Sequence, residues 1–411
     1  MTTTEIAADS SADANRTGVY LAVLQLVFTL GWTTYVIYLP KLCAEIGIAP
    51  ASVILILMLD QAIFTLTDTA MGIAADRIAP FVGRLGIFVG VVTAISCVAF
   101  IALPFVAGTG PGAQAWFIGL ILIWVVTSSA LRAPPLTLLG KHRARPQIPF
   151  LSALAMLGYG LAGAVSPYLG VMLRNQDARL PFLISGVVLL ITTLALSRVE
   201  RGIVDNAPPA KPIGPAKSLG QVPMFFIASM VILSLGYQLH FSINSAPFFL
   251  RFAAPDQLQW LMPVFWIGFN IAMFPASVIV KHRGGLIVMG GAGLLGALAV
   301  IGAELAGNLN MLIVAQFVAG AAWGCMLMSA ISAALAIGET GAEGKVTGLV
   351  FSALALATFA RMAAVAGGLQ KLPEYAPLLH WAPVACWSVA GAGLLVIAAS
   401  RAQRSMKMGR V

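Results

Sequence analysis

Long apolar segments separated by short polar turns run along almost the whole chain. Each segment stays apolar for roughly 20 residues or more, which is the length an α-helix needs to cross the hydrocarbon core of a bilayer. The segments do not alternate with polar residues, which argues against the strands of a membrane barrel. The pattern predicts twelve membrane-spanning helices, at 18–40, 50–74, 85–106, 114–138, 149–172, 180–197, 221–249, 257–280, 284–305, 309–336, 346–369 and 377–400.

A polar, proline-containing interval at 198–220 divides the predicted helices six and six. The fold class expected is therefore an all-α integral membrane protein with two pseudo-symmetric six-helix bundles. Two such halves joined by a linker are typical of carriers whose halves rock against each other. The predicted division is a disordered cytoplasmic tail (1–17), an N-terminal bundle (18–197), a cytoplasmic linker (198–220), a C-terminal bundle (221–400) and a cytoplasmic tail (401–411).

The composition agrees with a membrane protein. Apolar residues make up 59% of the chain and charged residues 9%, whereas about a quarter of an average soluble chain is charged. The four cysteines are far apart and show no metal-binding spacing, so we expect no metal and no cofactor. We find no phosphate-binding loop, zinc-type His-Glu-x-x-His or nucleophile elbow, so neither an enzyme nor an ATP-driven pump is expected.

Lysine and arginine are distributed unequally between the two sides of the predicted membrane. If the N-terminus lies inside, seventeen of them fall in inner segments and five in outer ones. This bias predicts that both termini face the cytoplasm, in the inner (plasma) membrane of the cell. The net charge of +9 is scattered over short turns, so it indicates topology and not nucleic-acid binding. We expect a monomer surrounded by lipid, with a small-molecule substrate and protons as the candidate coupling ion.

The turn after the second predicted helix carries the motif Gly72-x-x-x-Asp76-Arg77, followed by Gly83 and Arg84. Together with the twelve helices and the central interval, this motif resembles the major facilitator superfamily, which implies a transporter. The resemblance makes these five residues a gate. Gly72 would let its helix approach the other half, and Asp76 would face the partially positive N-terminus of the eleventh helix.

The wider spacing between Asp76 and Gly83 also resembles the glycoside–pentoside–hexuronide cation symporters and related sugar carriers. In that family an acidic residue at the position of Asp68 helps to hold the coupling cation. This chain has Thr69 where a proline follows, Phe64 where a second acidic residue is usual, and Arg132 where the fourth helix carries an acid. Because Arg132 would repel a cation, we expect that sodium does not drive transport.

Asp68 and Arg132 are predicted to form an ion pair. Asp68 lies eight residues before Asp76 and Arg132 nine before Lys141, so both stand about 12–13 Å from the inner turns. In the superfamily that the chain resembles, the second and fourth helices are neighbours. The pair is either a fixed structural pair or one that substrate or a proton can break.

Other polar groups lie inside predicted helices, where they are costly unless they serve a purpose. Asp60 either carries a proton or bonds a neighbouring helix, and it completes the coupling set with Asp68 and Arg132. Arg361 needs an acceptor, for which Glu304 and an anionic substrate are the two candidates.

The seventh predicted helix is unusually polar. Its side chains suit a sugar-like or zwitterionic ligand, or else helix–helix hydrogen bonds, and His240 is a second candidate proton carrier. The residues predicted to line a substrate site are Gln25, Tyr35, Tyr237, Gln238, His240, Asn244, Trp323 and Arg361.

The function predicted is secondary active transport of a small polar solute, sugar-like or an organic anion, by alternating access, proton-linked or uncoupled. One alternative is a proton-antiport exporter of drugs or organic anions. The glycines of the fifth helix, Gly158, Gly160 and Gly163, partly resemble the motif of such exporters, although close helix packing also explains them. The other alternative is a membrane sensor, or an assembly factor for pigment complexes, that transports nothing.

Overall fold

The computed structural model describes residues 3–78, 83–108, 110–141, 147–204, 221–338 and 341–408. Every regular element in these ranges is helical. Twelve of the resulting segments are long and apolar enough to cross a membrane. The predicted fold class and the predicted number of spans are therefore confirmed.

The N-terminal half contains the first six spans. The fourth span is not one continuous helix, because short 3₁₀ turns at Ser129–Leu131 and Pro134–Leu136 interrupt it. The helices of this half are α1 (Thr3–Glu45), α2 (Pro50–Ile78), α3 (Arg84–Ala102), α4 (Ala113–Ser128), α5 (Thr137–Lys141), α6 (Ile148–Leu173), α7 (Arg179–Leu194) and α8 (Leu196–Val204).

The C-terminal half contains the other six spans. Its first span combines α9 and α10 through a π-helical turn at His240–Asn244. The helices are α9 (Gln221–Leu239), α10 (Ser245–Leu250), α11 (Leu258–Leu261), α12 (Pro263–Arg283), α13 (Gly285–Glu304), α14 (Leu309–Ile337), α15 (Glu343–Ala366) and α16 (Ala376–Met408).

The segments outside the predicted bundles differ in part from expectation. Helix α1 already begins at Thr3, so 3–17 is helical where a disordered tail was expected. Helix α16 continues to Met408, into the expected C-terminal tail. Of the predicted linker, 198–204 is the end of α8, and 205–220 lies outside the described residues. The residues flanking the apolar segments also favour helix, and the length of an apolar segment carries no information about them.

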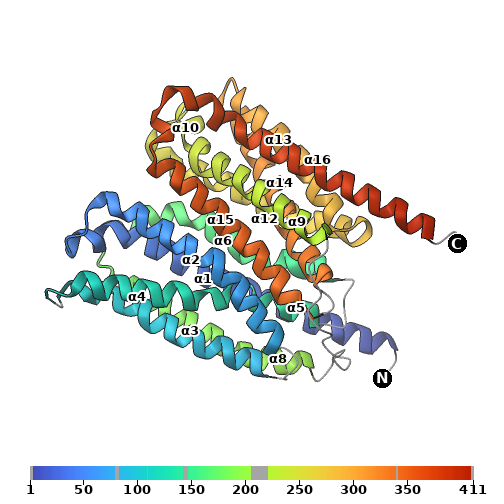
Figure 1. Ribbon diagram of the computed structural model, residues 1–411, viewed down its shortest axis with the longest axis horizontal. Helices are drawn as coiled ribbons and strands as arrows, with labels where there is room; N and C mark the ends of the chain where they lie inside the picture. The colour runs from blue at the N-terminus through green and yellow to red at the C-terminus, as the bar shows by residue number, and fades with distance from the viewer. Residues whose placement is uncertain are drawn as a thin grey trace.

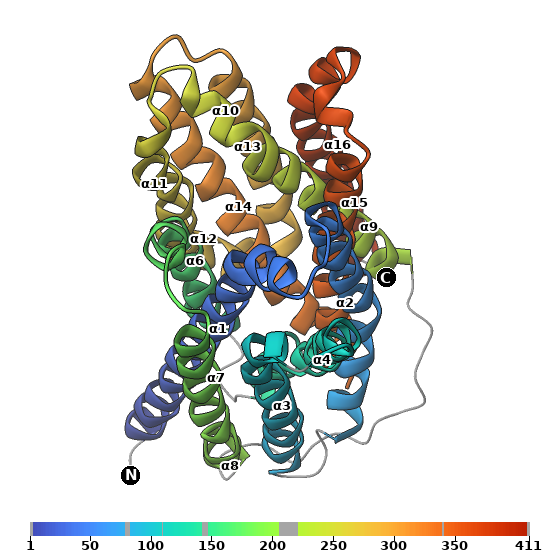
Figure 2. The same ribbon diagram turned by 90° about the vertical axis from the view of Figure 1, so that its left-hand side faces the viewer.

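The two halves lie beside each other and meet along two helix pairs. Helix α2 packs against α15, and α6 packs against α12. In Figure 1 the halves converge toward the side where α5 and α8 lie and diverge toward the opposite side, where α4 and α10 end. Figure 2, which views the molecule from that diverging side, shows α2 next to α15 and α6 next to α12. We call the converging side, with residues 76–78, 83, 84 and 341–345, the inner end.

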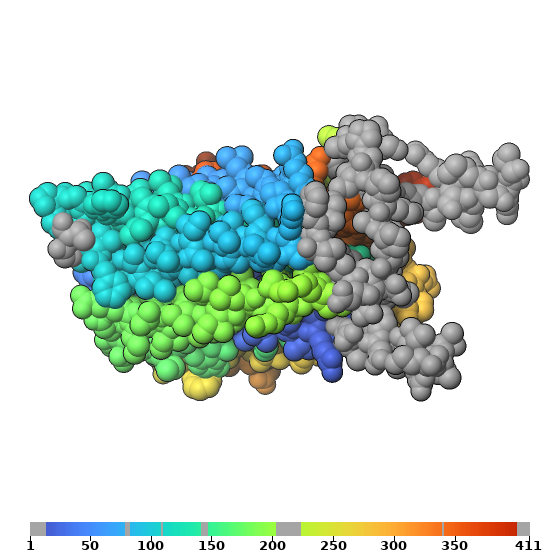
Figure 3. Space-filling view, turned by 90° about the horizontal axis from the view of Figure 1, so that it is seen from below, coloured from blue at the N-terminus to red at the C-terminus, as the bar shows by residue number. Residues whose placement is uncertain are grey.

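The outer surface of the halves is apolar, as a lipid-facing surface must be. Figure 3 shows α3, α4 and α7 side by side on one face of the N-terminal half. Large apolar side chains on this face are well exposed, among them Val98 (69%) and Ile191 (64%). Because water would not tolerate such a continuous apolar surface, this face is suited to hydrocarbon.

Candidate functional site

The gate motif joins the two halves at the inner end. Asp76, in the last turn of α2, accepts hydrogen bonds from the backbone N–H groups of Gly344 (2.6 Å) and Lys345 (2.8 Å). These two donors lie in the first turn of α15, where free N–H groups and the helix dipole attract a carboxylate. The predicted contact between Asp76 and the start of the eleventh span is therefore present.

Gly72 allows the close approach that this contact requires. A Cβ atom at Gly72 would overlap the backbone carbonyl of Gly344, and one at Gly344 would overlap the backbone of Gly72. The other gate residues lie around the adjoining turn. Gly83 has a positive φ of 76°, next to the side chain of Arg201, and the side chains of Arg77 and Arg84 are exposed.

Arg132 lies where the fourth span is broken. It follows the 3₁₀ turn that ends at Leu131 and has φ −90° and ψ −74°. Pro134 and Pro135 come next, and their missing N–H groups prevent a regular helix. The break leaves the carbonyl of Leu131 without its helical partner, and the Gln25 side-chain amide donates to it at 3.3 Å. Gln25 is buried, so its side chain stabilises the break and lines no open surface in this conformation.

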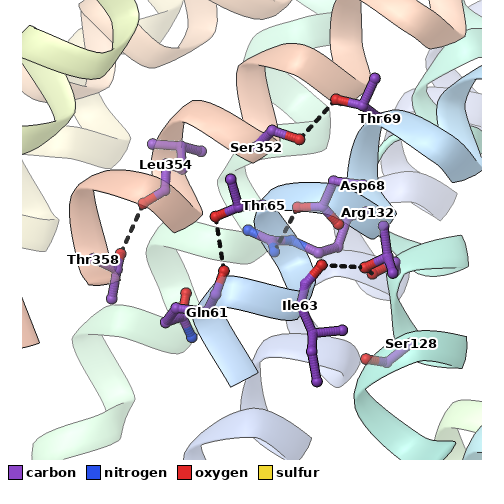
Figure 4. A network of polar contacts seen from close by, with 12 residues as sticks. Gln61, Ile63, Thr65, Asp68, Thr69, Ser128, Arg132, Ser352, Leu354 and Thr358 are labelled. Atoms are coloured by element: carbon purple, nitrogen blue, oxygen red, sulfur yellow. Dashed lines mark hydrogen bonds and ion pairs between the residues drawn. The ribbon is translucent and has the colours of Figure 1, made fainter. Parts of the chain in front are cut away.

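Asp68 and Arg132 form the predicted ion pair, with 2.7 Å between Arg132 Nη1 and Asp68 Oδ2. The Asp68 side chain is fully buried and that of Arg132 is 15% exposed. The guanidinium carbon lies 4.6 Å from the ring centre of Phe64 and 5.2 Å from that of Phe351. Because Phe351 belongs to α15, the pair is in contact with the opposite half. Figure 4 shows the pair between α2 and the broken span.

Hydroxyl groups flank the pair on both sides. Thr67 Oγ1 and Ser129 Oγ are 2.6 Å apart, and this hydrogen bond connects α2 to the broken span. Thr69 and Ser352 are 2.8 Å apart and connect α2 to α15 across the halves, as Figure 4 shows. A polar network therefore crosses from one half to the other about two helical turns from the gate contact.

Asp60 occupies a separate position inside the N-terminal half. Its side chain is fully buried, and its Oδ2 accepts a hydrogen bond from the Tyr35 hydroxyl at 3.0 Å. Among the described residues its Oδ1 has no hydrogen-bond partner. Tyr35 is itself fully buried, 4.5 Å from the ring centre of Trp124. Tyr35 thus contacts Asp60 in the bundle interior and lines no open surface in this conformation.

Two of the polar residues predicted in the seventh span are used for helix packing. His240 is fully buried, with Nε2 3.1 Å from the side-chain oxygen of Gln316 on α14. Asn244 is 2% exposed and donates to the carbonyl of Leu379 at 3.0 Å. Of the two alternatives, ligand binding and helix–helix hydrogen bonds, the second describes these two side chains in this conformation. The π-helical turn puts both residues on this inward face, and such turns are frequent at functional sites.

Gln238, two residues before His240, has different surroundings. Its amide nitrogen donates to Thr358 Oγ1 at 2.8 Å. Its amide oxygen accepts from Ser242 Oγ at 3.2 Å and from Arg361 Nε at 3.4 Å. Glu304, one of the two candidate partners of Arg361, lies elsewhere, with its Oε1 3.6 Å from His380 Nδ1. Gln238 and Arg361, both predicted from the sequence, therefore meet in one polar cluster.

An aromatic cluster lies next to these polar residues. The rings of Tyr237 and Trp323 stack at 4.5 Å and 2°. The Trp266 ring of α12 lies 6.2 Å from the Tyr237 ring and 5.5 Å from the ring of Tyr159 on α6, so the cluster connects the halves. Trp323 is fully buried and lines no open surface in this conformation. Tyr159 was missed from the sequence, since a single tyrosine in an apolar helix carries no pattern.

The glycines of the fifth span fit close packing. A Cβ at Gly158 would overlap the carbonyl of Ala22 on α1. A Cβ at Gly163 would come 2.4 Å from the ring of Trp266 on α12. The helix therefore needs small residues against both neighbours.

Two bundles of six spans, joined at one end by a helix-capping carboxylate and crossed by a polar network between α2, the broken span and α15, define a polytopic membrane protein built from two halves. Residues 21–360 match the family profile of the Major Facilitator Superfamily. The chain belongs to this family, which is a family of transporters and not of enzymes. A search of curated protein sequences gave no match.

Solved structures share the fold over nearly the whole chain. A bacterial homologue of the iron transporter ferroportin, in an outward-facing state, is 14% identical with a TM-score of 0.71, and the match covers 93% of this chain and 99% of that one. The E. coli fucose:proton symporter FucP is 12% identical with a TM-score of 0.68, covering 92% and 98%. The human organic anion transporter MFSD10 (TETRAN) is 14% identical with a TM-score of 0.67, covering 94% and 98%. At these identities the similarity shows the fold alone.

Proposed function

We propose that the protein is a secondary active transporter that moves a small polar solute across the membrane by alternating access. The observation that carries this proposal is the polar network around Asp68 and Arg132, which crosses between the halves at mid-span. Charged and hydroxyl groups are costly at this depth, and in transporters of this architecture the substrate site lies between the halves near the midplane.

The gate contact supports one particular state. With Asp76 bound to the start of α15, the halves are held together at the inner end. The charge bias predicts that this end lies on the cytoplasmic side of the plasma (inner) membrane. A conformation that is closed at this end is then an outward-facing state. The substrate would then enter from outside, and release inside would require these two hydrogen bonds to break.

Protons are the proposed coupling ion. The Arg132 guanidinium already balances Asp68, so a sodium ion would find no excess negative charge there. Asp60 has no ion-pair partner among the described residues, and a proton is the counter-charge that would suit it. His240 is tied to Gln316, which makes Asp60 the preferred candidate. FucP, which shares the fold, is a proton symporter.

Purified protein in proteoliposomes tests the proposal. Labelled sugars and organic anions would be offered under an imposed proton gradient, an imposed sodium gradient, or none. We expect uptake that follows the proton gradient and ignores sodium. Asp60→Asn should abolish accumulation but retain exchange of internal for external substrate, because exchange requires no net proton movement. Strong stimulation by sodium in the unmodified protein would refute the coupling proposal.

A proton-antiport exporter of organic anions is the second candidate. MFSD10 is described as an organic anion transporter, and Arg361 is a basic group inside a span. The same liposomes distinguish the two. An exporter would release protons as it takes up its anion in inverted vesicles, whereas a symporter would take both in the same direction. Failure to transport any solute, with a protein partner recovered in stoichiometric amount, would favour a non-transporting role.

A further inference from the structure

Arg361 is a half-buried basic side chain within a span, and the hydrogen-bond acceptor of its guanidinium is a neutral amide oxygen. It lies in the outer half of α15, sixteen residues beyond Lys345, or about 24 Å along the helix. Within the described ranges no carboxylate forms an ion pair with it, and its side-chain acceptor is the amide oxygen of Gln238 at 3.4 Å. That distance is long for a hydrogen bond from a guanidinium, which prefers about 2.7–2.9 Å to an anion.

Thr358 fixes which end of the Gln238 amide faces Arg361. The Thr358 hydroxyl donates its single hydrogen to the carbonyl of Leu354 at 2.8 Å. It can therefore only accept from Gln238, and the amide must present its nitrogen to Thr358. The amide oxygen is then directed to Ser242 and Arg361. A neutral oxygen is thus held beside the guanidinium, on the side from which an anion's oxygen could approach Nε.

The cluster faces the opposite half and not the lipid. On α15, Phe351 contacts Arg132, Ser352 contacts Thr69, and Ala355 is buried against the N-terminal half. Thr358 follows at the spacing of three and seven residues that continues one helix face. Figure 4 shows Thr358 beyond Ser352 along this helix. Beside Gln238 on α9, Tyr237 belongs to the aromatic cluster that reaches Tyr159 of the other half through Trp266.

We propose that Arg361 binds the anionic group of the transported solute and that the Gln238 amide oxygen holds this place when the solute is absent. The substrate class is a small organic anion, with a carboxylate or a group of like charge. This inference rests on the proposed transport function and deepens it. Binding exchanges one long hydrogen bond from a neutral acceptor for charge-assisted bonds to an anion, while Thr358 and Ser242 keep the displaced amide paired.

Thermal unfolding of the purified protein in detergent tests this site without knowledge of the natural substrate. The probes are benzoate, citrate and sulfate, with benzamide as the uncharged counterpart of benzoate. At least one anion should raise the unfolding temperature, and benzamide should not. Arg361→Gln should weaken the binding of that anion about tenfold to a hundredfold, and Arg361→Lys should weaken it less. Arg251→Gln is the matched control. Arg251 donates hydrogen bonds to the backbone carbonyls of Ala303 and Glu304, and its guanidinium lies over the rings of Phe248 and Phe252, away from the Gln238 cluster.

Gln238→Glu gives a test in the opposite direction. It supplies a permanent carboxylate to Arg361, so it should abolish the anion-dependent shift while raising the unfolding temperature without ligand. A preserved shift in this variant, equal shifts in Arg361→Gln and the unmodified protein, or no shift with any anion would overturn the proposal. So would an Arg361-dependent shift seen only with short-chain phosphatidylglycerol, which would identify a lipid headgroup as the ligand.

These outcomes are separable from those of the transport proposal. If liposomes carry out transport but Arg361→Gln leaves its substrate dependence unchanged, the anion site is wrong and the transporter assignment stands. If anions bind through Arg361 but no solute moves, the site stands and the transport proposal fails.

Discussion

Removing one member of the Asp68–Arg132 pair is expected to destabilise the protein more than removing both. Breaking a buried ion pair by taking away one partner leaves an uncompensated charge and typically costs about 3–5 kcal/mol. Replacing both partners with neutral residues of similar size leaves none. The changes are Asp68→Asn, Arg132→Gln and the two combined, which leaves the net charge of the protein unaltered.

The structure predicts that the two single changes differ. Arg132→Gln leaves the Asp68 carboxylate at 0% exposure, so we expect a loss near the upper figure, about 5 kcal/mol. Asp68→Asn leaves a guanidinium that is 15% exposed and lies within 5.2 Å of two phenyl rings, so about 3 kcal/mol is expected. For the double change we expect about 2 kcal/mol, from lost hydrogen bonds and packing. The double loss would then fall several kcal/mol below the sum of the single losses.

Equilibrium unfolding in mixed micelles, followed by tryptophan fluorescence, measures these differences. Refolding from the unfolded state must give the same curve before free energies are compared. Leu312→Ala, a packing change in a separate apolar cluster of the C-terminal half, serves as a control for additivity with each single variant. Losses for Asp68→Asn and Arg132→Gln that simply add in the double variant would refute the claim that the two charges compensate each other.

Three further outcomes concern the gate and the topology. Asp76→Asn should weaken the two hydrogen bonds from Gly344 and Lys345, so that cysteines at the inner end are labelled faster and transport slows. Unchanged labelling and turnover would contradict a gate role. Gly72→Ala should act more strongly in the same direction, because its methyl group would overlap the backbone of Gly344 and force α2 away from α15; wild-type labelling rates would disprove this. A cysteine at Pro209 should react with an impermeant reagent only from the cytoplasmic side, and reaction from outside would sink the predicted topology.

Features that depend on position along a helix were predictable from the sequence. The twelve spans follow from apolar length alone. The Asp68–Arg132 contact followed from equal depth plus a neighbour relation implied by the family resemblance. The Asp76 contact followed from the same resemblance and from the attraction of a helix N-terminus for a carboxylate.

Features that depend on which way a side chain faces were not predictable. His240 and Asn244 are polar like Gln238, yet the π-helical turn directs them into the packing of the C-terminal half. Pro247, which removes the helical partner of the Ile243 carbonyl, indicates a disturbance here but not which side chains it turns inward. Tyr159 was missed for a related reason. Its importance comes from its ring contact with Trp266 on the opposite half, and a contact between halves leaves no local pattern.

The three carboxylates of α2 show how one helix can connect coupling to gating. Asp60, Asp68 and Asp76 are eight residues apart, so each step rises about 12 Å and turns the side chain by about 80°. Asp60 consequently faces Tyr35 inside its own half, Asp68 faces Arg132 beside the other half, and Asp76 reaches the other half directly. A change in the protonation of Asp60 that tilts or rotates α2 must therefore alter the other two contacts, since the three groups share one rigid helix. The arrangement requires that Asp60→Asn and Asp76→Asn interact in a double-mutant cycle for inner-side accessibility, despite a separation of about 24 Å. Independent effects of the two changes would show that α2 does not transmit the coupling.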